Sequence, residues 1–337
     1  MTRKLSSARA KRNVAERKRD FGRAFSSSPA LSNRSAVRVA PKNRLLSLNF
    51  TAKRKKADTR KVQGTNTTSV PAAVRFTVDC SLQYELDATS HFIFQIELID
   101  SPGQRVVSET LVLQPPVILR PYIHTPTGNR LTRADIPAGR LDVRYQATVD
   151  VVPPVYATET LNEVPVSDIP SEFVHLLAPT RYCESDLLAS AAQKMFAGSP
   201  PGWARVEAIR AWIHDNVEYV VGSSDTTTTA CDVFVQRKGV CRDFAHLGIT
   251  FCRALNIPAR FVVGYIKFPE GSPDFHAVFE AWLGNQWVIF DATEMAPVEW
   301  LIRVGTGRDA KDVPFATIYG PARMLSMAPT VEQTLPG

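Results

Sequence analysis

Apolar and polar residues alternate over the first stretch of the chain that is not dominated by charge. From Val74 to Leu86 every second residue is apolar, which places one hydrophobic face on a strand. Short strands separated by turns that contain Gly and Pro are typical of sandwiches and barrels. We therefore expect an antiparallel β-sandwich-like domain over residues 71–153, with further strands at His91–Ile99, Arg105–Leu113, Pro116–His124 and Arg140–Val152.

The second half of the chain changes to a helical period. Within Arg205–Tyr219, apolar residues recur at intervals of three and four, which predicts one buried stripe made of Val206, Ile209, Ile213 and Val217. Helices are also expected at Asp186–Phe196 and at Cys241–Leu255, with Pro258 beyond the end of the latter. Strands follow, so residues 154–337 are predicted to form an α+β domain.

Two of these later strands, His276–Leu283 and Gln286–Phe290, are separated by Gly284-Asn285, a strong signal for a tight hairpin. A two-residue turn pairs Leu283 with Gln286. Continued along the strands, this register places His276 and Asp291 on the same face as diagonal neighbours, roughly 7–8 Å apart at Cα. A surface pair of His and Asp remains the alternative interpretation.

Cys241 is predicted to open a helix. The thiolate is the reactive form of cysteine, and the partial positive charge at a helix start favours it. A cysteine on an apolar helix is more often a core residue, so this position alone does not establish chemistry. His246 is a rival base, but five residues on a helix turn it about 140° away from the thiol. It is therefore expected to be structural.

The five cysteines form no CxxC pair, which predicts reduced thiols in the cytoplasm and gives no spacing for a zinc site. No segment approaches the ~18 apolar residues of a membrane span, and no apolar signal core is visible at the N-terminus. We therefore expect no membrane association. No run of calcium ligands is visible, so no metal or cofactor is expected.

Charge is distributed unevenly along the chain. Residues 1–65 hold 19 Lys and Arg against three Asp and Glu, whereas residues 66–337 hold 21 against 30. A basic tail over residues 1–70 is therefore predicted to be disordered beside an acidic globular body. Nucleic-acid contact through Lys53–Lys56 and a transit peptide are alternatives, and a solvated tail is the preferred interpretation.

Three blocks of sequence resemble the transglutaminase-like superfamily: Gly239–Leu247, Asp274–Ala277 and Phe290–Thr293, with Cys, His and Asp in that order. The resemblance extends over roughly residues 74–325 and includes the β-rich N-terminal region of bacterial members. It implies a papain-like core in which Cys241 is the nucleophile, His276 the general base and acid, and Asp291 the residue that orients the imidazole. It does not place a second oxyanion donor, for which Thr226–Thr229 and Gln236 are candidates.

Such a site performs two-step acyl transfer through a thioester. The preferred function is a cysteine protease or amidase that hydrolyses peptide or isopeptide amides of a peptide or protein substrate. An amine-incorporating, cross-linking transglutaminase is the alternative on the same site. A non-enzymatic binding module is a further alternative, which the presence of all three residues disfavours.

Overall fold

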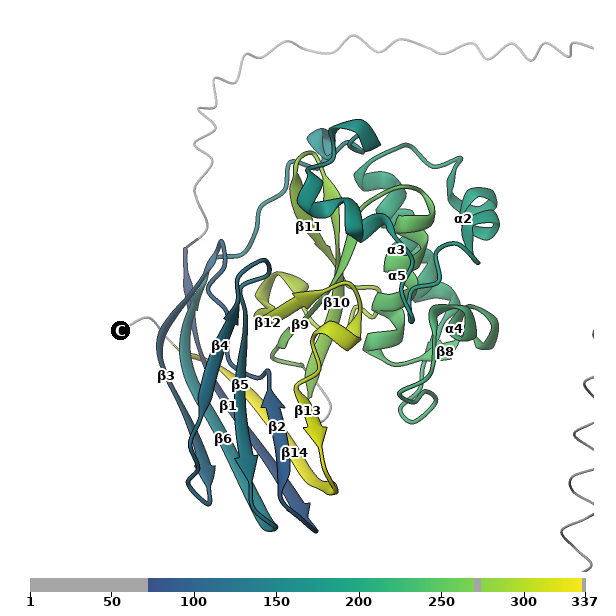
Figure 1. The fold of residues 1–337 in the computed structure, drawn as a ribbon. Coiled ribbons are helices and arrows are strands. Elements are labelled where there is room, and N and C mark those ends of the chain that lie inside the picture. The colour runs from purple at the N-terminus through teal and green to yellow at the C-terminus, as the bar shows by residue number, and fades with distance from the viewer. Residues whose placement is uncertain (1–71, 270–273, 335–337) are drawn as a thin grey trace, which may run out of the picture. The chain divides into compact units, whose positions relative to one another are not determined.

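The computed structural model describes residues 72–269 and 274–334. The predicted basic tail, residues 1–70, lies outside the described residues. Within them, long antiparallel strands form one part of the fold, and a smaller sheet covered by helices forms the other (Figure 1). The chain therefore has the α+β architecture that the sequence predicted.

The β-rich part consists of two antiparallel sheets. One has the order β14 (Ala322–Thr334), β1 (Val74–Leu86), β6 (Gly139–Val151) and β3 (Gln104–Gln114). The other has the order β13 (Ala316–Tyr319), β2 (Ser90–Phe94), β5 (Asn129–Ile136) and β4 (Arg120–His124). Strand β1 has the predicted bounds, and its apolar face is buried. The rings of Tyr84 and Phe92 meet between the sheets at 5.2 Å, as expected for a sandwich.

Several strands differ from the sequence prediction. Strand β2 ends at Phe94 although the apolar run continues to Ile99, β4 starts at Arg120, and β5 was missed. Strands β13 and β14 were also missed, and they pair with β2 and β1. Residues 316–334, which the sequence assigned to the catalytic domain, thus complete the two sheets of the sandwich.

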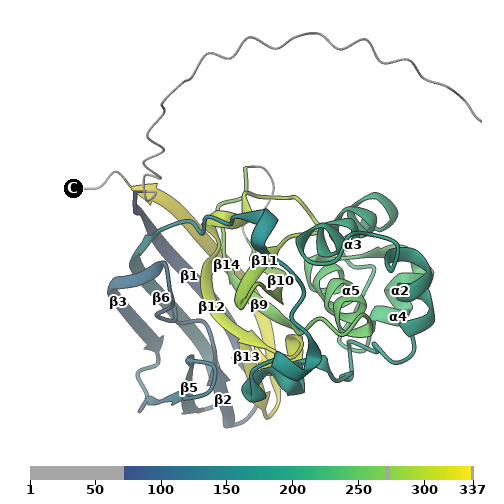
Figure 2. The same ribbon diagram turned by 90° about the horizontal axis from the view of Figure 1, so that it is seen from above.

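The second part is built around a four-stranded antiparallel sheet of order β11 (Gln286–Phe290), β10 (Phe275–Leu283), β9 (Ala259–Tyr265) and β12 (Ile302–Gly307). Its helices are α2 (Ala189–Phe196), α3 (Trp203–Asn216), α4 (Ala230–Gln236) and α5 (Cys241–Ala254). Helix α5 lies directly against β10, and the other helices lie beyond it (Figure 2). No helix of the described residues is long and apolar enough to cross a bilayer.

The predicted stripe of α3 is confirmed, since Val206, Ile209, Ile213 and Val217 are all buried. The predicted end of this helix is wrong. The helix stops at Asn216, and Val217 is extended. Residues Glu218–Tyr219 form β7, which pairs in parallel with β8 (Lys238–Gly239). The helix ends early for two reasons: Val217 is β-branched and suits extended structure, and the two residues after it pair with a segment 20 residues further along the chain.

The hairpin of β10 and β11 has the predicted register. Leu283 pairs with Gln286 and Phe279 with Phe290. Gly284 and Asn285 both have positive φ angles, 55° and 61°, which match the twist of a two-residue turn. The strand pairing ends at Phe290, so Asp291 follows directly after β11.

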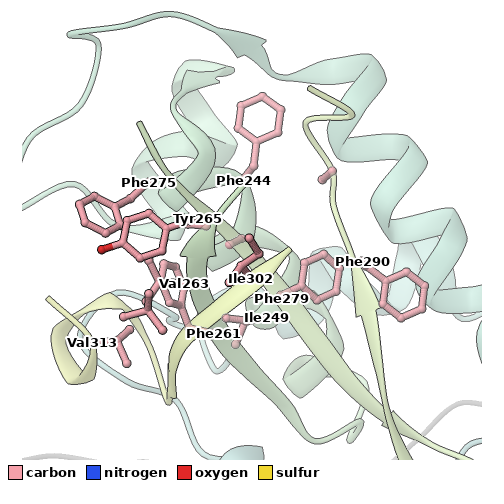
Figure 3. Close-up of a cluster of buried hydrophobic side chains, with 14 of the residues drawn as sticks. Phe244, Ile249, Phe261, Val263, Tyr265, Phe275, Phe279, Phe290, Ile302 and Val313 are labelled. Carbon is pink, nitrogen blue, oxygen red and sulfur yellow. The ribbon is translucent and has the colours of Figure 1, made fainter. Parts of the chain in front are cut away.

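A cluster of buried aromatic and aliphatic side chains lies between α5 and the sheet (Figure 3). Three of its members are close neighbours in sequence of the predicted site residues: Phe244 follows Cys241 by three residues, Phe275 precedes His276, and Phe290 precedes Asp291. Phe279 stacks on Phe290 with 5.5 Å between ring centroids. The core therefore fixes the backbone on which each predicted site residue stands.

The sandwich and the helix-covered sheet are joined by buried hydrogen bonds. Tyr265 of β9 donates from its hydroxyl to the carbonyl of Ile96 at 2.7 Å. The side chain of Asn129 bonds both backbone groups of Thr306, donating at 2.8 Å and accepting at 2.9 Å. Buried polar groups require such partners, so these bonds specify how the two parts pack.

Helix α5 approaches the sheet closely at Gly248. A Cβ atom on this residue would lie 2.5 Å from the ring of Phe279, which is itself buried and stacked. We expect Gly248→Ala to lower the free energy of unfolding by ~1–3 kcal/mol, because the ring cannot move aside without strain. Chemical denaturation measures this. Gly198→Ala is the matched control, since nothing lies within 4 Å of its Cβ position. Equal stability of the two variants would contradict the prediction.

Candidate active site

Cys241 is the first residue of α5, as predicted. Its side chain is half-buried, whereas Cys80, Cys183 and Cys252 are fully buried. A helix start presents free N–H groups and a partial positive charge, which stabilise a thiolate and a developing oxyanion. The thiol is therefore both partly accessible and placed at a helix start.

The start of α5 is held by the buried carboxylate of Asp243. This carboxylate accepts hydrogen bonds from the backbone N–H of Val240 at 2.9 Å and from the hydroxyl of Ser224 at 2.5 Å. It also accepts hydrogen bonds from the guanidinium of Arg242. The segment just before Cys241 packs closely against Asp243. A Cβ on Gly239 would lie only 2.7 Å from the Cβ of Asp243. These contacts fix the backbone that leads into Cys241.

His276 and Asp291 meet as the predicted register implied. The Nε2 atom of His276 lies 2.8 Å from Oδ2 of Asp291, and both residues are buried. The other carboxylate oxygen of Asp291 accepts from the N–H and the hydroxyl of Thr293, each at 2.8 Å. Burial excludes the alternative of a surface pair, and the bonds from Thr293 hold the carboxylate in place.

The second ring nitrogen of His276, Nδ1, is buried and has no hydrogen-bond partner among the described residues. The thiol of Cys241 lies close enough to interact with the ring. Burial lowers the pKa of His276, but the interactions of the ring with Asp291 and with the neighbouring Cys241 outweigh burial and raise the pKa to about 10. The imidazole is therefore held in its protonated form at neutral pH, next to the thiol.

The remaining thiols are chemically different. Burial is the main cause that raises the pKa of Cys80, Cys183 and Cys231 to about 12, and it raises that of Cys252 further. A raised pKa suppresses the thiolate and hence alkylation and nucleophilic attack. Cys231 is half-buried like Cys241, which makes it a useful reference thiol.

His246 is structural, as its position in the helix predicted. It is buried, its Nε2 accepts the N–H of Ala310 at 3.1 Å, and its ring stacks on Tyr182. Burial and the charges of Arg242 and Arg253 lower its pKa to about 3. It remains neutral, so it serves as a hydrogen-bond acceptor inside the core.

The structure thus brings Cys241, His276 and Asp291 together, although they come from a helix start, a strand and the end of a hairpin. A protonated imidazole between a carboxylate and a thiol can stabilise a thiolate and then donate a proton to a leaving group. One residue that the sequence did not single out, Tyr219, also lies beside Cys241. It was missed because the sequence placed it at the end of a helix.

Two family models match the chain. The transglutaminase-like superfamily core matches residues 189–292, and the bacterial transglutaminase N-terminal domain matches residues 74–172. The chain therefore belongs to the transglutaminase-like superfamily, with the bacterial type of N-terminal domain.

Individual relatives agree with this assignment. An uncharacterised protein of Mycobacterium leprae is 30% identical over 206 residues, which are 57% of this chain and 73% of that protein. An uncharacterised protein of Mycobacterium tuberculosis strain H37Rv is 34% identical over 116 residues, 30% of this chain and 37% of that protein. A crystal structure from Cytophaga hutchinsonii, described as a "Putative Cysteine Protease", superposes with a TM-score of 0.75 at 38% identity and covers 79% of this chain and 92% of that one. The superfamily core and the Cytophaga hutchinsonii neighbour support a thiol-dependent enzyme.

Replacing Asp291 with Asn tests the role of the carboxylate. The amide keeps the size but cannot supply the negative charge that raises the pKa of His276. We expect turnover to fall by ~10³–10⁴, the scale known for residues that orient a catalytic histidine. The basic limb of the pH–rate profile should move to lower pH, because His276 loses its proton earlier. Asp274→Asn removes a nearby carboxylate that has no bond to the ring and should change the rate far less. An Asp291→Asn variant of normal fold and normal rate would contradict the assignment.

His246 predicts a pH dependence of stability. Its pKa is lower in the folded chain than in the unfolded chain, so the unfolded state binds the proton preferentially as pH falls below about 6.5. The stability is fully present above that pH and declines towards pH 3. We expect the difference in unfolding free energy between pH 7.5 and pH 5 to be about 2 kcal/mol smaller in His246→Gln than in the wild type.

Urea denaturation at the two pH values measures this difference. The control is His175→Gln, because His175 is exposed and should leave the wild-type pH dependence unchanged. The same pH dependence in His246→Gln and the wild type would show that His246 is not the buried neutral group.

Proposed function

We propose that the chain is a cysteine hydrolase that cleaves peptide or isopeptide amides through Cys241, His276 and Asp291. The observation that carries this proposal is the buried pair of His276 and Asp291, 2.8 Å apart, whose imidazole interacts with the half-exposed thiol at the start of α5. A merely structural pair would not need to lie beside a half-exposed thiol at a helix start.

In the first step, the Cys241 thiolate attacks the amide carbonyl and forms the C–S bond, and the carbonyl oxygen takes up the negative charge. His276 then donates its proton to the leaving amine as the C–N bond breaks, which leaves a thioester. Asp291 stabilises the imidazolium and holds the ring orientation without itself taking a proton.

In the second step, the now neutral His276 accepts a proton from water, and the resulting hydroxide adds to the thioester carbonyl. Collapse of this intermediate breaks the C–S bond, releases the carboxylic acid and restores the thiolate and imidazolium. If an amine enters in place of water, the same steps give a new amide, which is the transglutaminase reaction. The Cytophaga hutchinsonii structure, described as a cysteine protease candidate, supports water as the acceptor.

The test uses a glutamine-containing peptide and a Gln–Lys isopeptide, each with and without a primary amine, analysed by mass spectrometry and ammonia release. We expect hydrolysis that Cys241→Ala abolishes, because no other thiol lies beside His276 in the described residues. The control variant Cys231→Ala removes the other half-buried thiol and should retain turnover.

Other outcomes would replace the proposal. Incorporation of the amine at the expense of hydrolysis would show a cross-linking transglutaminase. Turnover that persists in Cys241→Ala would show that the nucleophile is elsewhere. Absence of both reactions, together with slow alkylation of Cys241 by iodoacetamide, would indicate a binding module.

A further inference from the structure

A cavity of about 700 Å³ lies between the β-sandwich and the face of the four-stranded sheet that α5 does not cover. Phe279 of β10 points to α5, so the next residue, Glu280, points to the opposite face, where the cavity lies. Residues 99–104 and 151–156, at one end of the sandwich, form the other wall. None of the three candidate catalytic residues is among the described residues that line this cavity, so it is distinct from the candidate active site.

Three charged side chains from adjacent strands meet in the cavity wall: Arg260 of β9, Glu280 of β10 and Arg303 of β12. The carboxylate of Glu280 accepts from Nε of Arg260 at 2.7 Å and from Nη2 of Arg303 at 2.5 Å. Burial acts to raise the pKa of Glu280, but the two guanidinium groups outweigh it and lower the pKa, so the carboxylate is ionised. Two cations and one anion leave this group with one excess positive charge.

The guanidinium groups keep accessible surface, whereas the carboxylate between them does not. The side chain of Glu280 is 1% exposed, against 23% for Arg260 and 18% for Arg303. The ring of Trp287 lies against the guanidinium of Arg260, with 4.0 Å from Cζ to the ring centroid. The two Nη atoms of Arg260 have no hydrogen-bond partner among the described residues. A planar, oriented pair of charged donors is therefore left for an acceptor that enters the cavity.

Apolar side chains line another part of the wall, which favours an organic ligand over a bare inorganic ion. They belong to Ile99, Val152, Tyr156, Trp287, Val298 and Leu301. Asp100 and Glu299 also line the cavity, but both are exposed, so solvent screens their charges. A cavity of this size between two parts of a fold, with apolar walls and a few converging polar groups, is typical of small-molecule sites.

We propose that this cavity binds a small organic carboxylate. The carboxylate group pairs with the Nη donors of Arg260 beside Arg303, and the apolar part of the ligand packs against the apolar wall. A carboxylate matches the edge of a guanidinium with two parallel hydrogen bonds, and its charge compensates the excess positive charge of the group. The inference does not depend on the proposed acyl-transfer function.

The experiment uses ¹⁵N-labelled indole groups to locate the probe. Of the five tryptophans, Trp282 and Trp287 line the cavity, whereas Trp212 packs against Phe251 among the helices. We expect 4-phenylbutyrate to shift the indole signals of Trp282 and Trp287 in a saturable manner and to leave that of Trp212 unchanged. The uncharged 4-phenylbutanamide should bind ~10-fold more weakly or worse, because it cannot form the charge-assisted hydrogen bonds.

Two substitutions separate the charge arrangement from a general effect on the fold. Glu280→Gln removes the carboxylate that competes for both guanidinium groups, so 4-phenylbutyrate should bind ~10-fold more tightly. Arg260→Lys keeps the positive charge but lacks the planar pair of donors, so the same probe should bind ~10-fold more weakly. Arg120→Lys is the matched control, because Arg120 is an exposed partner of Asp135 elsewhere and should leave the affinity unchanged. Thermal melts verify that each variant is folded.

Four results would overturn the inference. Absence of saturable shifts at Trp282 and Trp287 in the wild type would show that the cavity takes no such ligand. Equal affinity for the acid and the amide would show that only the apolar part is recognised. Weaker binding to folded Glu280→Gln would show that Glu280 does not compete with the ligand. Tighter binding of phenyl phosphate than of 4-phenylbutyrate would assign the cavity to phosphate ligands in place of carboxylates.

Discussion

The site depends on the close approach of α5 to β10. At Gly248 the helix backbone reaches the ring of Phe279 without room for a Cβ, and that ring stacks in turn on Phe290. Helix α5 therefore packs against strand β10, and β10 packs against its hairpin partner β11. Each of the three carries one residue of the candidate site at or next to its end. Because protein interiors are close-packed, this arrangement leaves little freedom in the distance between the thiol and the imidazole.

Two buried histidines show that the neighbouring groups determine whether a buried imidazole is neutral or protonated. Burial alone disfavours the charged form of both rings. His246 faces positively charged arginines and an N–H donor, so its pKa falls to about 3 and it serves as an uncharged acceptor. His276 faces the carboxylate of Asp291 and the thiol of Cys241, so its pKa rises to about 10. One residue type thus supports the core in one place and offers a transferable proton in the other.

The β-sandwich completes the structure on which the helix-covered sheet rests. Strand β14 pairs with β1 from Arg75 to Leu86. Strand β9 pairs with β10, which carries His276. The hydroxyl of Tyr265 on β9 donates a hydrogen bond to the carbonyl of Ile96 in the sandwich. Next to it, the buried Glu280 of β10 holds the guanidinium groups of Arg260 and Arg303, which lie on β9 and β12. Breaking such a buried charge group is costly, so it ties β10 to β9 and to β12.

The sequence by itself determined what depends on local pattern. Strict alternation defined β1, the three-and-four spacing defined the buried stripe of α3, and Gly284-Asn285 set the hairpin register that brings His276 to Asp291. Side-chain period and turn geometry act over a few residues, so they can be read from the chain. Only the tertiary structure decided that Nε2 of His276 bonds Asp291, that β14 pairs with β1, and that Tyr219 lies in a short strand beside Gly239 instead of in a helix. Those outcomes depend on pairing between segments distant in sequence, whose energies no local pattern contains.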